Sequence, residues 1–150
     1  MRFVHISLNA RDWRELSKFY IDVFKCKVKP PKRDLSGRWL NKAIGLKDVK
    51  IEGIHLVLPG YNKFLPTLEI FTYSVMVDSK QKKPNNRGFA HIAFEVRSVK
   101  NTLQLAIQNG GKKLGEIVKK EIDAVGEIEF AYFYDPEGNI VEIQSWNKAK

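Results

Sequence analysis

An internal repeat constrains the fold of this 150-residue chain more than any other feature of its sequence. The segment His5–Trp13 aligns with His91–Val99 at an offset of 86 residues, and the His, Ile and Arg positions are identical. The segment Leu68–Tyr73 aligns with Val141–Trp146 as apolar-Glu-Ile-x-hydroxyl-aromatic, at an offset of 73 residues. Self-similarity of this kind indicates repeated structural units, so we expect two related halves.

Each half predicts the same order of secondary-structure elements. Alternating runs rich in apolar residues at 3–9 and 89–96 predict strands. Asp12 and Ser98 follow these runs and are good helix N-caps, and helically spaced apolar residues come after each cap. Gly110-Gly111 ends the second helix. A short strand is expected after each helix, and further strands are predicted at 51–58, 68–73, 128–134 and 140–144, with a tight turn at 135–139.

This element order predicts an α+β fold in which each half is a strand, a helix and about three strands. We expect the first half at 1–79, a polar linker at 80–87 and the second half at 88–150, together forming one structural domain. The first half is longer by 13 residues, which fall in the stretch that contains Trp39. Gly37–Gly45 is expected to form a short helix. Two interpretations stay open: it covers a pocket with Trp39 packed beneath it, or it is a surface helix without that role.

The repeat places two kinds of metal-binding side chain at matched positions. His5 and His91 open equivalent strands, and Glu69 and Glu142 lie in equivalent last strands. A Glu between apolar neighbours in a strand points away from them, into solvent or into a polar cavity. Repeated halves that pack about a pseudo-two-fold axis would bring all four residues around one point. Two imidazoles and two carboxylates suit a divalent ion such as Zn, Ni, Co, Mn or Fe, so the sequence predicts a metal site.

Strand alternation predicts which other residues surround such a site. Residues separated by two positions share a face of a strand, which places Asn9, Glu95, Phe71 and Tyr73 near a substrate. For an aromatic residue such as Phe71, a role in the core or at a dimer interface stays open. His55 has no partner in the repeat, and we expect it to be structural or to line the pocket.

The composition narrows the classes of partner. The chain has 26 basic and 17 acidic residues, a net charge of +9, and 43% apolar residues, which is typical of a globular protein. The basic residues concentrate between positions 25 and 50. Two interpretations stay open: a lysine-rich solvated surface, or a positive field that attracts an anionic small-molecule substrate. The charge is not accompanied by a nucleic-acid-binding motif, and no apolar run reaches the length of a membrane span or signal peptide. With Cys26 as the single cysteine, we expect a cytoplasmic protein that binds neither nucleic acid nor membrane.

Two motifs and one helix carry a family resemblance. The motifs are Gly-Phe-Ala-His-Ile-Ala-Phe-Glu-Val at 88–96 and Tyr-Asp-Pro-Glu-Gly-Asn-Ile-Val-Glu-Ile at 134–143, and the helix spans 13–24. With these features the chain resembles the vicinal-oxygen-chelate superfamily of glyoxalases, bleomycin-resistance proteins and extradiol dioxygenases, over essentially its whole length. The resemblance implies two βαβββ modules that form a cupped, mixed sheet around the site. It also implies a homodimer, because members often dimerise and some share the metal site across the interface.

The resemblance also implies a chemistry. Metal-using glyoxalases have a His, Glu, His, Glu ligand set, which corresponds to His5, Glu69, His91 and Glu142 here. The complete set favours a metal-dependent lyase or isomerase that removes a proton next to a carbonyl, with the resulting enediolate stabilised by the metal. By analogy with the family, Glu142 is the catalytic base and Glu69 its counterpart.

Three other functions stay open at this point. A methylmalonyl-CoA-epimerase-like isomerase is one, although those enzymes often have Gln where this chain has Glu69. An Fe(II) extradiol-type dioxygenase would use two His and one Glu as metal ligands, and Glu69 would then not bind the metal. A metal-free protein that binds and sequesters a drug would have no use for the ligand set. Within the glyoxalase interpretation, Asn9 stands where glutathione-dependent enzymes commonly have Arg, which argues against glutathione as the thiol.

Overall fold

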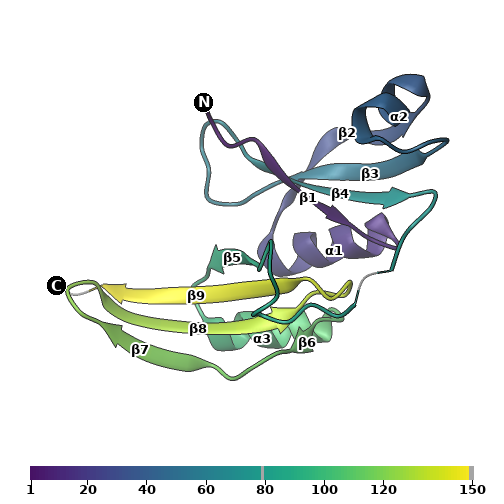
Figure 1. Cartoon of the computed structure of the whole chain (residues 1–150). Helices are drawn as coiled ribbons and strands as arrows, with labels where there is room; N and C mark the ends of the chain where they lie inside the picture. The colour runs from purple at the N-terminus through teal and green to yellow at the C-terminus, as the bar shows by residue number, and fades with distance from the viewer. Residues whose placement is uncertain (79, 149–150) are drawn as a thin grey trace. The chain divides into compact units, whose positions relative to one another are not determined.

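The chain divides into two compact units, Met1–Ser79 and Lys80–Lys150 (Figure 1). The structure is a computed structural model that describes residues 1–78 and 80–148. Each unit consists of one mixed sheet and its helices, so the α+β class expected from the sequence is confirmed. Within the described ranges, no helix combines the length and apolarity that crossing a bilayer requires.

The first unit is a four-stranded sheet with the strand order β1-β4-β3-β2. Its first strand runs parallel to its last, and the other neighbours are antiparallel. The elements in chain order are β1 (His5–Asn9), α1 (Trp13–Phe24), β2 (Lys27–Ser36), α2 (Arg38–Ile44), β3 (Lys50–Val57) and β4 (Thr67–Tyr73).

The second unit repeats this topology. Strand β5 is parallel to β9, and β9 is antiparallel to β8. Strand β8 in turn pairs with β6 and β7, so the single strand expected after the helix is divided in two. The elements are β5 (Ile92–Glu95), α3 (Val99–Gln108), β6 (Lys112–Lys113), β7 (Val118–Ile122), β8 (Gly126–Tyr134) and β9 (Ile140–Lys148).

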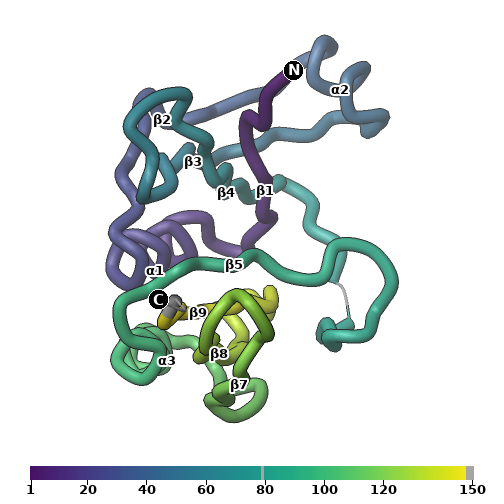
Figure 2. The backbone as a smooth tube through the Cα atoms, turned by 90° about the vertical axis from the view of Figure 1, so that its left-hand side faces the viewer, coloured from purple at the N-terminus to yellow at the C-terminus, as the bar shows by residue number. Residues whose placement is uncertain are grey.

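The long helix of the first unit packs on one face of its sheet. Asp12 caps α1 by accepting a hydrogen bond of 2.8 Å from the backbone N–H of Arg14, as the sequence predicted. The helix buries one side against β3 and β4 (Figure 2). On that side lie the buried residues Leu16, Phe19, Tyr20, Val23 and Phe24, and the sheet contributes Leu56, Leu68 and Ile70.

The second unit is built in the same way. Ser98 caps α3 by accepting a hydrogen bond from the backbone N–H of Asn101, which confirms the second predicted cap. Val99, Leu103 and Ala106 are buried, and the helix contacts β6, β8 and β9. Each sheet therefore has a helix on one face, and the residues that alternate with the buried ones project from the other face.

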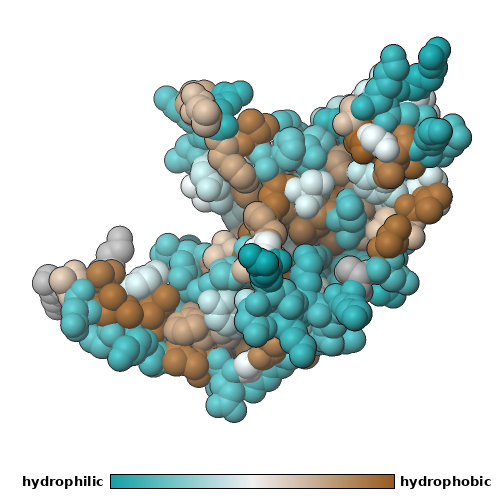
Figure 3. All heavy atoms as spheres, in the orientation of Figure 1, coloured by the Kyte–Doolittle hydropathy of each residue, from teal (hydrophilic) through white to brown (hydrophobic). Residues whose placement is uncertain are grey.

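The other face of the first sheet is partly covered by α2. Leu40 of this helix packs in a hydrophobic cluster with Val49, Ile51 and Phe71. The short helix expected in this stretch is therefore present and contacts the face from which Glu69 projects. Of the two interpretations left open for this helix, packing of Trp39 beneath it is wrong, because Trp39 is 59% exposed and Leu40 occupies the buried position. Elsewhere several large apolar side chains are exposed, among them Phe64, Val77 and Phe89. Figure 3 shows groups of apolar side chains among polar ones on one face.

Candidate functional site

The first predicted ligand pair comes together within the first unit. Glu69 lies in β4 between Leu68 and Ile70, which are fully buried on the side of α1. Strand alternation therefore directs Glu69 to the opposite face, where 13% of its side chain is exposed. His5 opens the neighbouring strand β1, and its Nδ1 lies 3.4 Å from Oε1 of Glu69. An imidazole and a carboxylate thus face each other at the position that the repeat predicts.

A second imidazole meets the same carboxylate oxygen. His55 is the direct cross-strand partner of Glu69 in the β3–β4 ladder, and its Nε2 lies 3.2 Å from Oε1. Its ring packs edge-on against Phe71, with the ring centroids 5.8 Å apart. Burial lowers the pKa of His55 although the Glu69 carboxylate acts in the other direction, so the neutral imidazole is favoured. The sequence indicated a structural or pocket-lining residue here and did not show the contact with Glu69.

The second predicted pair comes together within the second unit. Glu142 lies in β9 between the fully buried Val141 and Ile143, so it too projects from the face opposite the helix. Nε2 of His91, the residue just before β5, lies 2.9 Å from Oε2 of Glu142. The two side chains are 35% and 12% exposed, so the carboxylate is largely buried but has a polar partner.

Tyr132 accompanies this second pair, and sequence reasoning missed it. It is the direct cross-strand partner of Glu142 in the β8–β9 ladder and hydrogen-bonds to the Glu142 carboxylate. Its ring lies edge-on to the ring of His91, with a centroid separation of 5.3 Å. Burial, followed by the bond to the carboxylate, raises the pKa of Tyr132 to about 12. The phenol is therefore neutral at physiological pH, and its O–H is the donor.

The two units thus repeat a three-residue arrangement. In each unit the Glu lies in the last strand, the His opens the first segment, and a third polar side chain stands opposite the Glu on the adjacent strand. Ser7 and Ala93, each two residues after the His, are the parallel-strand partners of Glu69 and Glu142. The strand registers are therefore equivalent, and His55 and Tyr132 occupy corresponding positions although the sequence repeat does not match them.

Comparison with known families decides the classification of this fold. Residues 2–143 match the family model of the Glyoxalase/Bleomycin resistance protein/Dioxygenase superfamily. The chain belongs to this superfamily. The resemblance drawn from the two motifs and the helix is thereby confirmed. No curated protein sequence matches the chain with significance.

Solved structures of the superfamily share the fold at low sequence identity. A glyoxalase family protein from Bacillus cereus is 15% identical, with 97% of this chain and 94% of that chain covered and a TM-score of 0.82. A glyoxalase family protein from Enterococcus faecalis is 22% identical, with 95% and 96% covered and a TM-score of 0.58. A variant of the fosfomycin resistance protein FosX from Listeria monocytogenes, solved with Mn(II) and dihydroxypropylphosphonic acid, is 20% identical, with 97% and 93% covered and a TM-score of 0.58.

The predicted substrate residues of this superfamily member differ in their surroundings. Asn9 and Glu95 are exposed at the ends of β1 and β5. Phe71 is 9% exposed and belongs to the hydrophobic cluster under α2, and Tyr73 is partly buried against the same cluster. Phe71 therefore has a packing role, which the sequence analysis had left open. Contact of these four residues with a substrate stays a prediction.

The donor atoms fit the type of metal that the superfamily resemblance implies. In each unit an imidazole nitrogen and a carboxylate oxygen face each other, and both are common ligands of Zn, Ni, Co, Mn and Fe. Across residues 1–78 and 80–148, no group of three or more His, Cys, Asp or Glu side chains is arranged to hold a metal ion. Each pair on its own supplies two ligands, and a site that uses both pairs stays a prediction.

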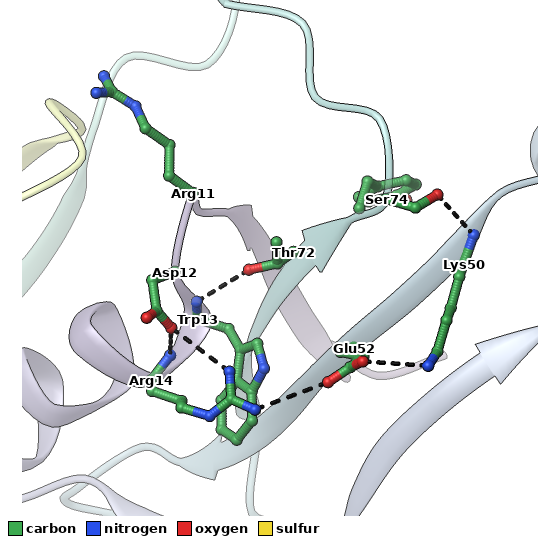
Figure 4. Close-up of a pocket in the computed structure, with 9 residues that line it drawn as sticks. Arg11, Asp12, Trp13, Arg14, Lys50, Glu52, Thr72 and Ser74 are labelled. Carbon is green, nitrogen blue, oxygen red and sulfur yellow. Dashed lines mark hydrogen bonds and ion pairs between the residues drawn. The ribbon is translucent and has the colours of Figure 1, made fainter.

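A separate pocket of about 270 Å³ lies at the start of α1 (Figure 4). Glu52 and Thr72 are cross-strand partners on the α1 side of the sheet, so this pocket opens on the face opposite Glu69. Its polar groups bond mainly to one another: Thr72 accepts a hydrogen bond from the Trp13 N–H, and Glu52 lies 3.2 Å from Lys50 Nζ. The pocket therefore contains none of the predicted metal ligands.

Proposed function

We propose that this superfamily member is a metal-dependent lyase or isomerase of the glyoxalase kind, which removes a proton next to a carbonyl group of a small molecule. The observation that carries the proposal is the equivalent His–Glu pair in each of the two units. A lone His–Glu contact is common in proteins, whereas its repetition at matched strand positions favours a shared purpose for both pairs. A divalent ion bound there would act as a Lewis acid on the carbonyl oxygen of the substrate.

The proposed ligands are His5 and Glu69 from the first unit and His91 and Glu142 from the second. Together they provide two nitrogen and two oxygen donors for Zn, Ni, Co, Mn or Fe. Both pairs come from one chain or, in the homodimer that we also propose, from two chains. The FosX variant solved with Mn(II) supports a divalent metal as the cofactor, because its chain has the same fold.

The two carboxylates also suit the proton transfer. Removal of a proton from carbon needs an unprotonated base close to the substrate, and return of the proton at a neighbouring atom needs an acid. We assign the base to Glu142 and the counterpart role to Glu69. Both side chains project from the sheet face opposite the long helix of their unit, and both are largely shielded from water yet contact polar partners. A repeated pair of carboxylates therefore supplies one group for each direction of transfer.

The substrate class follows from charge and from the surrounding residues. The net charge of +9 favours an anionic small molecule, and Asn9, Phe71, Tyr73 and Glu95 are the proposed substrate contacts. A second candidate is a metal-dependent resistance enzyme acting on a small phosphonate. The FosX structure with a bound phosphonic acid favours it, and a phosphonate is also anionic.

An anaerobic turnover assay with defined metals tests the proposal. The purified chain is loaded separately with Ni²⁺, Co²⁺, Zn²⁺ or Mn²⁺. It is then assayed for hemithioacetal isomerisation and for exchange of the α-hydrogen of a 2-substituted acyl thioester with D₂O. We expect turnover with at least one metal, its loss after chelation, and its loss in Glu142→Gln. Glu116→Gln, in an exposed loop, is the matched control and should keep the activity.

Other outcomes of this assay, and companion assays in air or with other substrates, would point elsewhere. Turnover that persists after complete removal of metal would contradict the proposal. Oxygen consumption with Fe²⁺ and a catechol would favour the extradiol-type dioxygenase, and conversion of an epoxide phosphonate would favour the resistance enzyme. Binding of a drug without metal or turnover would favour the sequestering protein.

A further inference from the structure

Each proposed carboxylate ligand has a polar side chain directly opposite it on the neighbouring strand. Strand β3 places His55 opposite Glu69, and strand β8 places Tyr132 opposite Glu142. The positions are equivalent because each Glu lies in the last strand of its unit and each partner lies in the antiparallel strand before it. A direct cross-strand pair brings the two Cβ atoms close enough for the side chains to bond.

We infer that His55 and Tyr132 are positioning residues that orient the Glu69 and Glu142 carboxylates for metal binding. This inference rests on the proposed function and extends it to two residues outside the ligand set. It assigns the same task to two different chemical groups, an imidazole in one unit and a phenol in the other.

Tyr132 is held so that its hydroxyl group reaches Glu142. Its ring lies edge-on to His91 and edge-on to Phe130, with centroid separations of 5.3 Å and 5.9 Å. These contacts hold the ring against the proposed ligand His91 and against Phe130 on the same strand, while the O–H bonds to the carboxylate. A phenol O–H is a hydrogen-bond donor, so Tyr132 can donate to the Glu142 carboxylate across the strand pair.

His55 is held in the corresponding way in the first unit. Its side chain is 16% exposed, against 46% for His5, and it packs edge-on against the buried Phe71. Its Nε2 faces Oε1 of Glu69 at 3.2 Å, a distance at which a neutral imidazole protonated at Nε2 can donate to this oxygen. We therefore treat the more exposed His5 as the metal ligand and the more buried His55 as the positioning residue.

The loss of metal affinity that follows removal of such a positioning residue has a typical size. Outer partners that hydrogen-bond to a ligand fix its orientation, and their loss weakens metal binding by about 10- to 100-fold. A carboxylate on a Glu side chain has several rotamers, and a fixed hydrogen bond removes those that point away from the site. Replacement of His55 or Tyr132 should therefore weaken metal binding without removing a metal ligand.

Tyr132→Phe compared with Tyr134→Phe tests the second unit. Tyr134 lies on the same strand, and its hydroxyl group donates to the backbone oxygen of Lys82 at 2.9 Å, so each variant deletes one hydrogen-bonded phenol oxygen. The full-length protein is titrated with Co²⁺, and visible absorption reports both affinity and coordination geometry. We expect Tyr132→Phe to bind Co²⁺ about 10- to 100-fold more weakly with a shifted spectrum, and Tyr134→Phe to match the wild type.

His55→Leu compared with His55→Gln tests the first unit. Leu removes the donor, whereas Gln keeps an N–H that reaches toward Glu69. We expect weaker Co²⁺ binding in His55→Leu and partial recovery in His55→Gln. A purely structural role for His55 would lower thermal stability in both variants and leave the Co²⁺ spectrum unchanged.

The outcomes separate this inference from the proposed function. If wild type binds Co²⁺ and His91→Ala weakens it, but Tyr132→Phe and His55→Leu bind like wild type, the positioning role is overturned and the metal site stands. If wild type binds no Co²⁺, both proposals are overturned. If Tyr132→Phe does not fold, judged by circular dichroism, the His55 pair decides, and unchanged Co²⁺ binding in His55→Leu overturns the inference.

Discussion

Replacing Gly53 with Ala should destabilise the protein and disturb the Glu69 site. Gly53 is the cross-strand partner of Phe71, two residues from His55 on the same face of β3. A Cβ atom at this position would overlap with the carbonyl oxygen of Ile70 and with Cδ1 of the Phe71 ring, and would lie 3.0 Å from the Ile70 carbonyl carbon. Glycine is thus required here by close approach of backbone and ring.

The size of the effect follows from what must move. Overpacking in a well-packed core costs about 1–3 kcal/mol. One of the obstructing groups is backbone, so β3 and β4 have to separate, and we expect the upper part of this range. For a chain of this length, a loss of about 2–3 kcal/mol lowers Tm by roughly 4–12 °C. The same separation displaces His55 from Glu69, so Co²⁺ binding should weaken as well.

Thermal unfolding followed by circular dichroism measures the change, with Gly115→Ala as the matched control. A Cβ atom at Gly115 would have no neighbour within 4 Å, and its φ lies outside the left-handed region. We therefore expect the Tm of Gly115→Ala to remain close to that of wild type. A Gly53→Ala variant whose Tm and Co²⁺ affinity equal those of Gly115→Ala would refute the argument from close packing.

The remaining predictions concern three single side chains. Glu142→Gln should keep the fold and most of the metal while losing turnover; full activity would refute its role as base, and loss of metal would show that it is primarily a ligand. Burial raises the pKa of the Cys26 thiol from its ordinary value of 9.0 to about 12. The thiol should therefore react slowly with a thiol reagent at pH 8 in the folded protein and rapidly after unfolding in urea. A fast reaction in the folded state would contradict this prediction. Because the unfolded thiol loses its proton first, this group should also lower stability as pH rises above its ordinary pKa of 9.0. Asp135 is 1% exposed and accepts hydrogen bonds from the backbone N–H groups of Glu137 and Asn139 and from the Asn139 side-chain amide. Asp135→Ala should therefore lower the free energy of unfolding, measured in urea, by about 2–4 kcal/mol. An unchanged urea midpoint would argue against this bonding.

The elements and the four candidate ligands could be identified from the sequence because their signals are local or repeated, and their meeting around one ion stays a prediction. Asp12 and Ser98 are recognisable caps, since a helix N-terminus needs a side-chain acceptor for its first N–H groups. The histidines and glutamates recur at matched positions. The positions of these residues in strands then fixed which face of each sheet they occupy.

The two positioning residues could not be predicted, because their contacts with the carboxylates depend on strand register. His55 and Tyr132 differ in residue type, so the repeat does not align them, and their contacts arise only when β3 pairs with β4 and β8 with β9. The sequence also left open whether Trp39 is buried, for a similar reason. A helix of seven residues is too short for its apolar spacing to show which side is buried, and tertiary packing selected Leu40.

The number of Co²⁺ ions bound per chain, measured for wild type, His5→Ala and His91→Ala, tests the central claim most directly. If one ion is held jointly by the ligand pairs of both units, wild type binds one ion per chain, and either single variant loses that ion. Two ions per chain, with each variant losing only one of them, or no bound ion at all, would contradict the account.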